Sequence, residues 1–335
     1  MKKTEQGSLL ILALWSLLLL AAFSVSLGYG VRQKAALVDR LETLDSLIPM
    51  AASGVEAARG LIKVEDTTPN SDSLSDEWSQ NNALFKERGM GDKGYFSVSN
   101  LVSNGSSREA AVFYGLVDEQ SNININTSDA ATITRVLQFS GGLDKDTAED
   151  IAHCIVDWRD TDSTFQHPNY GAEEDYYNHL NIPYTAKNAP FEAIDELLLV
   201  KGINRAIFDK IKGFLALYGT GEVNINTAPK EALLALGLEE RLADKVVGYR
   251  NGTDKEDRTG DDRVFVQGST IIADLNKVSA IDQAETAVIE NLISAGKLGT
   301  RSSHFSVKSK GTLHKNGAFL EMESVIDRKG RIYYL

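Results

Sequence analysis

The chain has 335 residues, of which 42% are hydrophobic and 24% charged, and its formal net charge is −12. This length and composition allow two modest globular domains. The negative charge opposes broad contact with nucleic acid or anionic lipid, because both need clustered lysine and arginine. The chain has one cysteine, Cys154, which cannot form an internal disulfide, so cysteine usage does not indicate the redox compartment.

The N-terminal segment is apolar. From Ser8 onward the chain meets no charged residue until Arg32, and about 20 apolar helical residues span a bilayer. We therefore predict a transmembrane helix over residues 8–31. A secretory signal peptide is the alternative, because Lys2 and Lys3 supply a positive n-region. Its apolar region is typically only about 7–15 residues long, so we favour a retained anchor.

Residues 5–12, EQGSLLIL, resemble the class III leader that a prepilin peptidase removes after glycine. The resemblance implies that residues 1–7 are a cleaved leader, cut between Gly7 and Ser8, and that the protein is methylated. Type IV pilins and most pseudopilins carry glutamate at the fifth mature position, where this chain has Leu12. A glutamate in lipid is costly without a partner, so Leu12 suggests a subunit with no neighbour above it. In that family this departure marks the minor pseudopilin K of type II secretion systems.

The helix is predicted to continue beyond the anchor, because apolar residues recur at steps of three or four and would bury one face. They are Val31, Ala35, Val38, Leu41, Leu44, Ile48, Ala52, Val55, Ala58 and Ile62. Pro49 is expected to kink or interrupt this helix near Ile48, since proline lacks the N–H and clashes with the preceding turn. Residues 65–80 are polar and predict a loop.

Short β-like runs lie on both sides of a long helical region. Residues 95–102 and 109–117, separated by the Asn-Gly-Ser-Ser of 104–107, predict a hairpin, and 304–308, 318–325 and 331–335 predict an antiparallel meander. Helices are expected at 130–139, 147–159, 192–198, 205–218, 230–236 and 241–250. The predicted fold class is α+β: residues 32–118 supply a long helix and the first strands, an all-α domain (119–296) is inserted, and 297–335 complete the sheet.

Six carboxylates flank one short polar loop. They are Asp157, Asp160, Asp162, Glu173, Glu174 and Asp175. Calcium takes six to eight oxygen ligands, but an EF-hand is excluded, because Phe165 stands where that loop needs glycine. A solvated acidic loop is the alternative, and Asp157 has the alternative role of ending the preceding helix. We favour calcium, because the carboxylates would repel one another without a counter-ion. A second acidic loop contains Asp254, Asp257 and Asp261 without ordered spacing, and a second ion there is no better supported than a solvated turn.

These segments also carry the family resemblance further. Residues 157–162 (DWRDTD), 171–177 (GAEEDYY), 182–184 (IPY), 200–202 (VKG) and 223–228 (VNINTA) resemble the α domain of the minor pseudopilin K of type II secretion systems. The resemblance implies a single-pass protein of the bacterial inner membrane with a periplasmic globular part. It also implies calcium bound by that part, here on Asp160, Asp162, Glu173, Glu174 and Asp175.

A short repeat marks the helical region: Asn-Ile-Asn-Thr occurs at 124–127 and again at 224–227, each time before an expected helix. The favoured explanation of this repeat is structural: at both places a strand or turn leads into a helix. The segment 199–203, followed by Ile207 and Ile211, also resembles a helix-hairpin-helix, which grips phosphates through backbone N–H groups. The alternative function is therefore a membrane-anchored, competence-like DNA-binding protein. Acidic surroundings without an arginine stripe favour packing or protein contact instead.

The chain lacks the common catalytic motifs, including the nucleophile elbow, the P-loop, the dinucleotide fingerprint and His-Glu-x-x-His. His153 and Cys154 are adjacent and point about 100° apart on a helix, so they cannot act as base and nucleophile. We expect no enzyme. The resemblance implies a cap at the tip of a secretion pseudopilus that helps export folded proteins. Its implied partners are pseudopilins I, J and possibly H, a prepilin peptidase, the inner-membrane assembly platform, and a secreted substrate or the outer-membrane secretin; nucleic acid is not expected.

Overall fold

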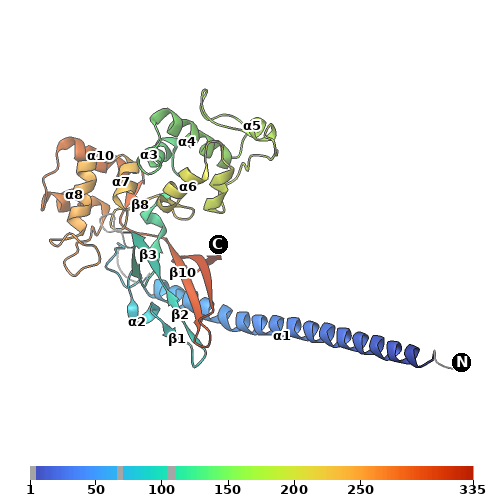
Figure 1. Ribbon diagram of the computed structural model, residues 1–335. Helices are drawn as coiled ribbons and strands as arrows, with labels where there is room; N and C mark the ends of the chain where they lie inside the picture. Colours follow the sequence, from blue (N-terminus) through green and yellow to red (C-terminus); the bar gives the residue numbers. More distant parts are fainter. Residues whose placement is uncertain (1–4, 66–70, 104–109, 335) are drawn as a thin grey trace.

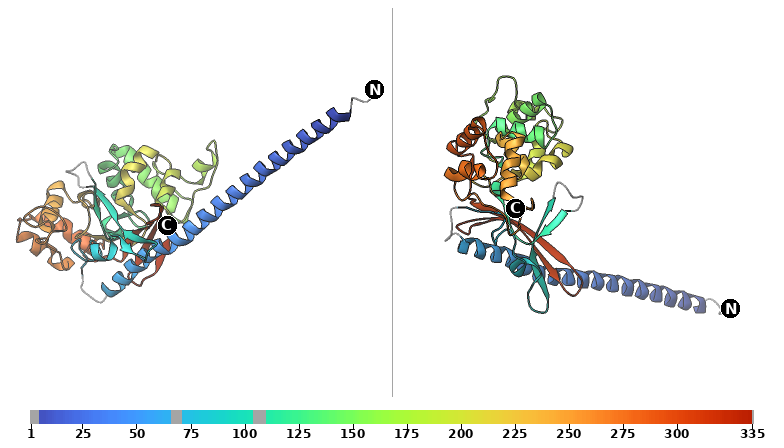
Figure 2. Two further views of the ribbon diagram at one scale, coloured as in Figure 1. Left: turned by 60° about the horizontal axis from the view of Figure 1, so that its bottom comes forward. Right: turned by 90° about the vertical axis from the view of Figure 1, so that its left-hand side faces the viewer.

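The computed structural model describes residues 5–65, 71–103 and 110–334. Figure 1 shows three parts: a long N-terminal helix, a small β-sheet against the C-terminal half of that helix, and a larger region of short helices. Figure 2 shows from two further sides that the sheet lies between the long helix and the helical region.

Helix α1 (Glu5–Glu65) contains a segment long and apolar enough to cross a membrane, with a mean hydropathy of 2.4. Its first half projects away from the rest of the chain (Figure 2), and Leu17 and Phe23 are 66% and 75% exposed. Gly7 and Ser8 lie in its first turn, and cleavage between them stays a prediction. The predicted interruption at Pro49 is wrong, because α1 runs through it. Proline removes one helical hydrogen bond there, and packing on the sheet supports the turns that follow.

Only the C-terminal part of the predicted apolar face of α1 is buried. Its buried side chains begin at Leu47 and include Val55 and Ile62, whereas Val38 and Leu41 are 53% and 51% exposed. Where α1 crosses strand β10 (His304–Leu313), Gly311 allows a close approach. A Cβ atom at Gly311 would lie 2.8 Å from the backbone nitrogen of Ala51, so the buried half of the face is fixed by contact with this strand.

The main sheet is antiparallel, with strand order β1-β2-β10-β11-β12 and with β5 also paired to β10. The other strands of this sheet are β1 (Arg88–Gly89), β2 (Gly94–Val98), β5 (Val117–Asp118), β11 (Phe319–Asp327) and β12 (Ile332–Tyr334). Strands from both sides of the helical region therefore complete one sheet. This arrangement confirms the predicted α+β fold class and the C-terminal meander.

The predicted hairpin is also present, as a separate two-stranded sheet. Strands β3 (Asn100–Ser103) and β4 (Ala110–Phe113) pair antiparallel, with Leu101 opposite Val112. The turn predicted at 104–107 lies outside the described residues. A short helix, α2 (Asn82–Phe85), precedes β1 and places Phe85 in the core beneath the main sheet.

The helical region lies between β5 and β10. Its elements are η1 (Glu119–Ser121), β6 (Ile123–Asn124), α3 (Ala130–Phe139), α4 (Lys145–Arg159), α5 (Glu174–Asn178), η2 (Ile194–Leu199), α6 (Arg205–Ile211), η3 (Lys212–Phe214), β7 (Leu215–Ala216), β8 (Val223–Asn224), α7 (Lys230–Leu236), α8 (Glu240–Arg250), η4 (Gly268–Thr270), α9 (Ile271–Asn276), α10 (Gln283–Ser294) and β9 (Leu298–Gly299). The helix predicted at 205–218 is too long, because Leu215 and Ala216 leave it to pair with β6. Helices α5, α9 and α10 were not predicted.

The helical region is joined to the sheet by a buried polar junction at Asp118, which is 2% exposed. Its Oδ2 accepts hydrogen bonds from the Asn224 side chain at 3.3 Å, the Ser302 hydroxyl at 2.6 Å and the Thr227 hydroxyl. Its Oδ1 accepts the backbone N–H of Gln120 at 2.8 Å. Burial raises the pKa of Asp118 to about 6, so the junction contains a carboxyl whose charged form is disfavoured.

Candidate functional site

The helical region consists of two halves built in the same way. In each half a short strand pairs in parallel with the last strand of that half: β6 pairs with β7, and β8 with β9. The side chains of Asn126 and Asn226 each form two hydrogen bonds with one backbone residue, Phe191 and Phe265 respectively, at 2.7 to 3.0 Å. The sequence repeat at 124–127 and 224–227 therefore marks a structural duplication.

An arginine at the end of the second helix closes each half. Arg250 of α8 donates to the carbonyl oxygens of Ile225 and Ala228 at 2.8 and 2.7 Å. Arg159 of α4 makes the equivalent contacts with Ile125 and Ser128. Sequence analysis missed both arginines. Their shared position at the end of a helix that follows Asn-Ile-Asn-Thr was the available signal.

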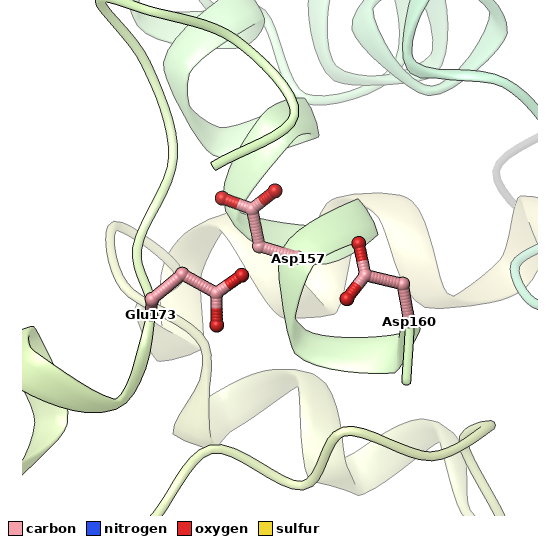
Figure 3. A group of neighbouring side chains, drawn as sticks. All are labelled: Asp157, Asp160 and Glu173. Carbon is pink, nitrogen blue, oxygen red and sulfur yellow. The ribbon is translucent and has the colours of Figure 1, made fainter. Parts of the chain in front are cut away.

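The candidate metal centre lies where α4 ends. Oxygen atoms of Asp157, Asp160 and Glu173 lie within 4.8 Å of one another. Figure 3 shows that Asp157 and Asp160 come from the end of α4 and Glu173 from the segment before α5, and that the carboxylates of Asp160 and Glu173 point toward each other with Asp157 beside them. Gly171 lets this segment approach, because a Cβ there would collide with Oδ2 of Asp157 and its φ is +118°. The chain therefore assembles the group from two segments 13 or more residues apart in sequence.

The group contains carboxylate oxygens that lack hydrogen bonds. Asp157 is fully buried, and its two oxygens accept the backbone N–H groups of Gln166 and Ala172, both at 3.1 Å. Among the described residues, neither oxygen of buried Glu173 nor Oδ1 of Asp160 has a hydrogen-bond partner. Unsatisfied buried carboxylates are costly, and hard cations bind carboxylate oxygens. The donor set therefore fits a cation such as calcium.

The electrostatics of the group agree with this fit. Burial, together with the charges of Asp160 and Asp162, raises the pKa of Asp157 to about 6. Burial and the neighbouring carboxylates raise the pKa of Glu173 to about 7. Arg159 does not neutralise them by direct pairing, because its guanidinium donates to backbone carbonyls on the other side. A bound cation would remove this repulsion.

The other three predicted ligands lie outside the group. The carboxylate of Asp162 is exposed and accepts hydrogen bonds from Thr164. Glu174 is exposed and accepts from Asn178 at 3.4 Å, while the Asp175 side chain is 91% exposed and lies 3.5 Å from His179. The structure therefore brings together three of the six carboxylates.

The second acidic loop has partners of its own. Asp261 accepts hydrogen bonds from both the backbone and the hydroxyl of Thr253 at 2.6 Å. Asp257 pairs with Arg258 at 3.0 Å, and Asp254 accepts from the backbone of Glu256. Within the described part of the chain, these carboxylates do not form a group comparable to Asp157, Asp160 and Glu173.

Two further candidates from the sequence serve packing. Cys154 is fully buried, and burial raises the pKa of its thiol to about 12, whereas the ring of His153 packs at a tilt against that of His167, with ring centroids 4.8 Å apart. In the predicted hairpin at 199–203, Lys201 pairs with Asp150 at 3.2 Å. The lysine that would contact a phosphate is therefore engaged inside the domain, which does not favour DNA binding.

The family model described as "Type II secretion system (T2SS), protein K" matches residues 94–220. The type II secretion system protein K of Pectobacterium carotovorum subsp. carotovorum is 29% identical over 177 residues, 52% of each chain. That of Aeromonas hydrophila is 32% identical over 94 residues, 27% of this chain and 28% of the other. That of Klebsiella pneumoniae is 25% identical over 242 residues, 68% of this chain and 69% of the other. The match thus spans about half the length of the first of these relatives and less of the second.

A solved structure has the same fold. A chain of the GspK-GspI-GspJ complex from the type 2 secretion system of enterotoxigenic Escherichia coli aligns with a TM-score of 0.65. The alignment covers 90% of this chain and 97% of the other at 18% identity, which establishes similarity of fold alone. The family model, the relatives and the shared fold all point to the type II secretion system protein K family, and the N-terminal helix is long and apolar enough to cross a membrane.

Proposed function

We propose that this protein is the minor pseudopilin that caps the tip of the type II secretion pseudopilus and initiates its assembly. In this role it would help export folded periplasmic proteins across the outer membrane, with its globular part in the periplasm. Similarity to the protein K family carries the proposal. The anchor supports it, because Leu12 stands where other pseudopilins carry the glutamate that pairs with a neighbouring subunit.

The shape of the chain also supports a position at the end of a filament. The helical region is inserted between β5 and β10 and extends from the sheet on the side away from α1 (Figure 2). Subunits stacked above this one would meet that bulk. The exposed apolar stretch of α1 before Leu47, including Val38 and Leu41, supplies a surface for neighbouring helices below.

Pseudopilins I and J are the proposed neighbours, because the solved complex with this fold contains both GspI and GspJ. Pseudopilin H, the assembly platform, and the secretin or a secreted substrate are further proposed contacts. Prepilin peptidase would act between Gly7 and Ser8 before assembly.

Electron microscopy of pseudopili labelled on this protein tests the tip position. The expected result is label at one end of each filament. Label spaced along the filament would refute a cap. A Gly7→Leu variant serves as the control, because an unprocessed precursor should stay in the membrane and leave the filaments unlabelled.

We further propose that Asp157, Asp160 and Glu173 hold calcium. Their clustered charge and the unpartnered oxygens of Asp160 and Glu173 support this. A bound ion would supply a positive charge that ties the end of α4 to the segment before α5. Residues outside the described contacts of this group, or water, would complete the six to eight oxygen ligands that calcium takes.

Calorimetric titration of the metal-depleted full-length protein with calcium tests this site. Saturable binding should be lost in Asp160→Asn and Glu173→Gln. The matched controls are Asp162→Asn and Asp175→Asn, which remove exposed carboxylates outside the group. Equal loss in the controls, or unchanged binding in Glu173→Gln, would assign the calcium to another place.

A further inference from the structure

Each half of the helical region has a groove between its second helix and the turn that follows its fourth helical segment. This groove differs between the two halves. In the first half this groove runs between α4 and Val200-Lys201. In the second half it runs between α8 and Val278-Ser279. The turns correspond, because Val200 and Val278 each donate a backbone hydrogen bond to a buried leucine, Leu197 and Leu275, at 3.1 and 3.0 Å.

In the first half the chain fills its own groove. The connection 160–190 folds back over α4, and Tyr177, which is fully buried, packs edge-on against Trp158 with ring centroids 5.1 Å apart. The Tyr177 hydroxyl accepts the backbone N–H of Lys201 at 3.3 Å. This covering segment leaves Val200 only 2% exposed.

In the second half the equivalent groove is open. The connection 251–264 is much shorter and turns toward the β3-β4 hairpin, where Arg258 lies over the ring of Phe113 at 4.2 Å. What remains is a groove of about 680 Å³. Its lining includes Tyr249, Gly248, Val278 and Ser279. Val278 is 53% exposed, whereas its counterpart Val200 is buried.

The two grooves differ in their charged side chains. Counting back from Arg159 and Arg250, Asp157 corresponds to Gly248 and Asp160 to Asn251, so the second groove lacks both carboxylates. Asp150, which pairs with Lys201 in the first half, corresponds to Arg241. Arg241, Lys245 and Lys255 line the second groove, with Asp244 as its acidic member. Arg241 pairs with Asp282 at 2.6 Å and with Glu285 at 3.0 Å, and Lys245 pairs with Glu285 at 2.8 Å. Lys230 pairs with Asp244 at 2.6 Å. An acidic segment is repelled by the carboxylates of the first groove. The corresponding positions of the second groove carry no negative charge, so they would not repel such a segment.

We propose that the groove between α8 and Val278-Ser279 binds a short acidic segment of a partner protein that inserts a tyrosine. The tyrosine ring would pack on Tyr249 and Val278, with its hydroxyl directed toward the turn at Val278-Ser279. Unlike that of Lys201, the backbone N–H of Ser279 already donates to the carbonyl of Leu275, at 2.9 Å. The segment's carboxylates would face Arg241 and Lys255. The segment that fills the first groove is an example of such an occupant, because the two grooves are built from corresponding elements. This site is separate from the proposed tip function.

A peptide with the sequence of residues 170–184, YGAEEDYYNHLNIPY, is the probe. It is labelled with fluorescein and titrated with the full-length protein in detergent, and fluorescence anisotropy reports binding. We expect saturable binding that weakens at least about tenfold when the peptide tyrosine matching Tyr177 is replaced by alanine. Absence of saturable binding at millimolar protein would overturn the proposal.

Gly248→Trp is the blocking variant. A Cβ atom at Gly248 would meet no atom within 4 Å, so α8 accepts a side chain at this position. A tryptophan ring there would occupy the groove that Gly248 lines. Gly213→Trp is the matched control, because Gly213 is equally open and lies in η3, outside the groove. We expect Gly248→Trp to abolish peptide binding and Gly213→Trp to retain it. Equal binding by both variants would overturn the assignment. So would self-association of the unmodified protein that is lost in Gly248→Trp, because the occupant of the groove would then be a second copy of this chain.

Discussion

The two halves of the helical region share one frame but have different tasks. Each begins with Asn-Ile-Asn-Thr and is closed by an arginine on two carbonyl oxygens. The first half carries the carboxylate group and covers its own groove. The second half supplies Asn224 and Thr227 to the buried junction at Asp118 and leaves its groove open. The comparison teaches that one duplicated frame can carry a carboxylate group in one copy and a buried junction with the sheet in the other.

The first asparagine of the repeat displays this division most directly. Asn224 is fully buried, and its amide donates to the carbonyl of Asp72 at 3.1 Å, to Asp118 at 3.3 Å and to Ser302 at 2.8 Å. The amide of Asn124 reaches one carbonyl, that of Leu217, at 3.5 Å. Both side-chain oxygens accept the N–H of the residue two positions on. The same residue thus supports a local turn in one half and an interdomain junction in the other.

The largest effect should come from breaking that junction. Asn224→Ala should lower the free energy of unfolding by at least about 2 kcal/mol more than Asn124→Ala, because it leaves the buried Asp118 carboxylate and the Asp72 carbonyl short of a donor. Urea unfolding of the two variants measures the difference. Since both substitutions remove the local turn bond, their comparison isolates the junction. Equal losses would mean that the three additional contacts contribute nothing measurable.

Removal of calcium should affect only the first half. An ion bound by the native state alone stabilises it by about 2.7 kcal/mol when free calcium is 100-fold above Kd. Chelation should therefore lower the melting temperature and should increase hydrogen exchange in residues 157–185. The second half, residues 223–299, is the internal control. Loss of protection in both halves to the same extent would contradict an ion site confined to Asp157, Asp160 and Glu173.

The pH dependence should show the buried carboxyl of the junction. Since the pKa of Asp118 is raised to about 6 from 3.8, its contribution is most favourable below pH 3.8 and is lost as pH rises through 6. Lowering the pH from 7 to 5 should recover about 1 kcal/mol of stability from this group. Urea unfolding of Asp118→Asn and of the unmodified protein, both in chelator and at both pH values, measures this effect. The variant should lack the gain in stability at the lower pH. An identical pH slope in the two proteins would show that Asp118 does not titrate in this range.

Much of the fold could be predicted from the sequence because its signals are local. The apolar run of α1, the alternation in β10 to β12 and the helices at 130–139 and 230–236 depend on residues close together in the chain. The end of α6 was misplaced because Leu215 and Ala216 have a helical pattern but pair with β6, ninety residues away in sequence. Long-range pairing overrides local periodicity.

The candidate site shows the same limit. The acidic character of residues 157–175 is visible in the sequence, but which carboxylates converge depends on the path of the loop. Gly171 brings Glu173 onto Asp157, and the short helix α5 then turns Glu174 and Asp175 toward solvent. The duplication was visible only as a repeat of four residues. Its extent depends on Arg159 and Arg250, which lie at different distances from the repeat in the two halves.

The smallest effect concerns position 248 of α8, where the second groove has glycine and the first groove has Asp157. Gly248→Ala should raise the free energy of unfolding by about 0.5 to 1 kcal/mol, since glycine within a helix is less stable than alanine and the added Cβ meets no atom within 4 Å. The equivalent change in the first half, Asp157→Ala, should lower stability in calcium, because it removes a proposed ion ligand and the acceptor of two backbone N–H groups. Thermal unfolding in calcium should therefore give shifts of opposite sign. Shifts of the same sign would mean that the side chain at position 157 contributes no more to stability than the one at position 248. The duplicated frame, rather than the ion, would then set the stability of both halves.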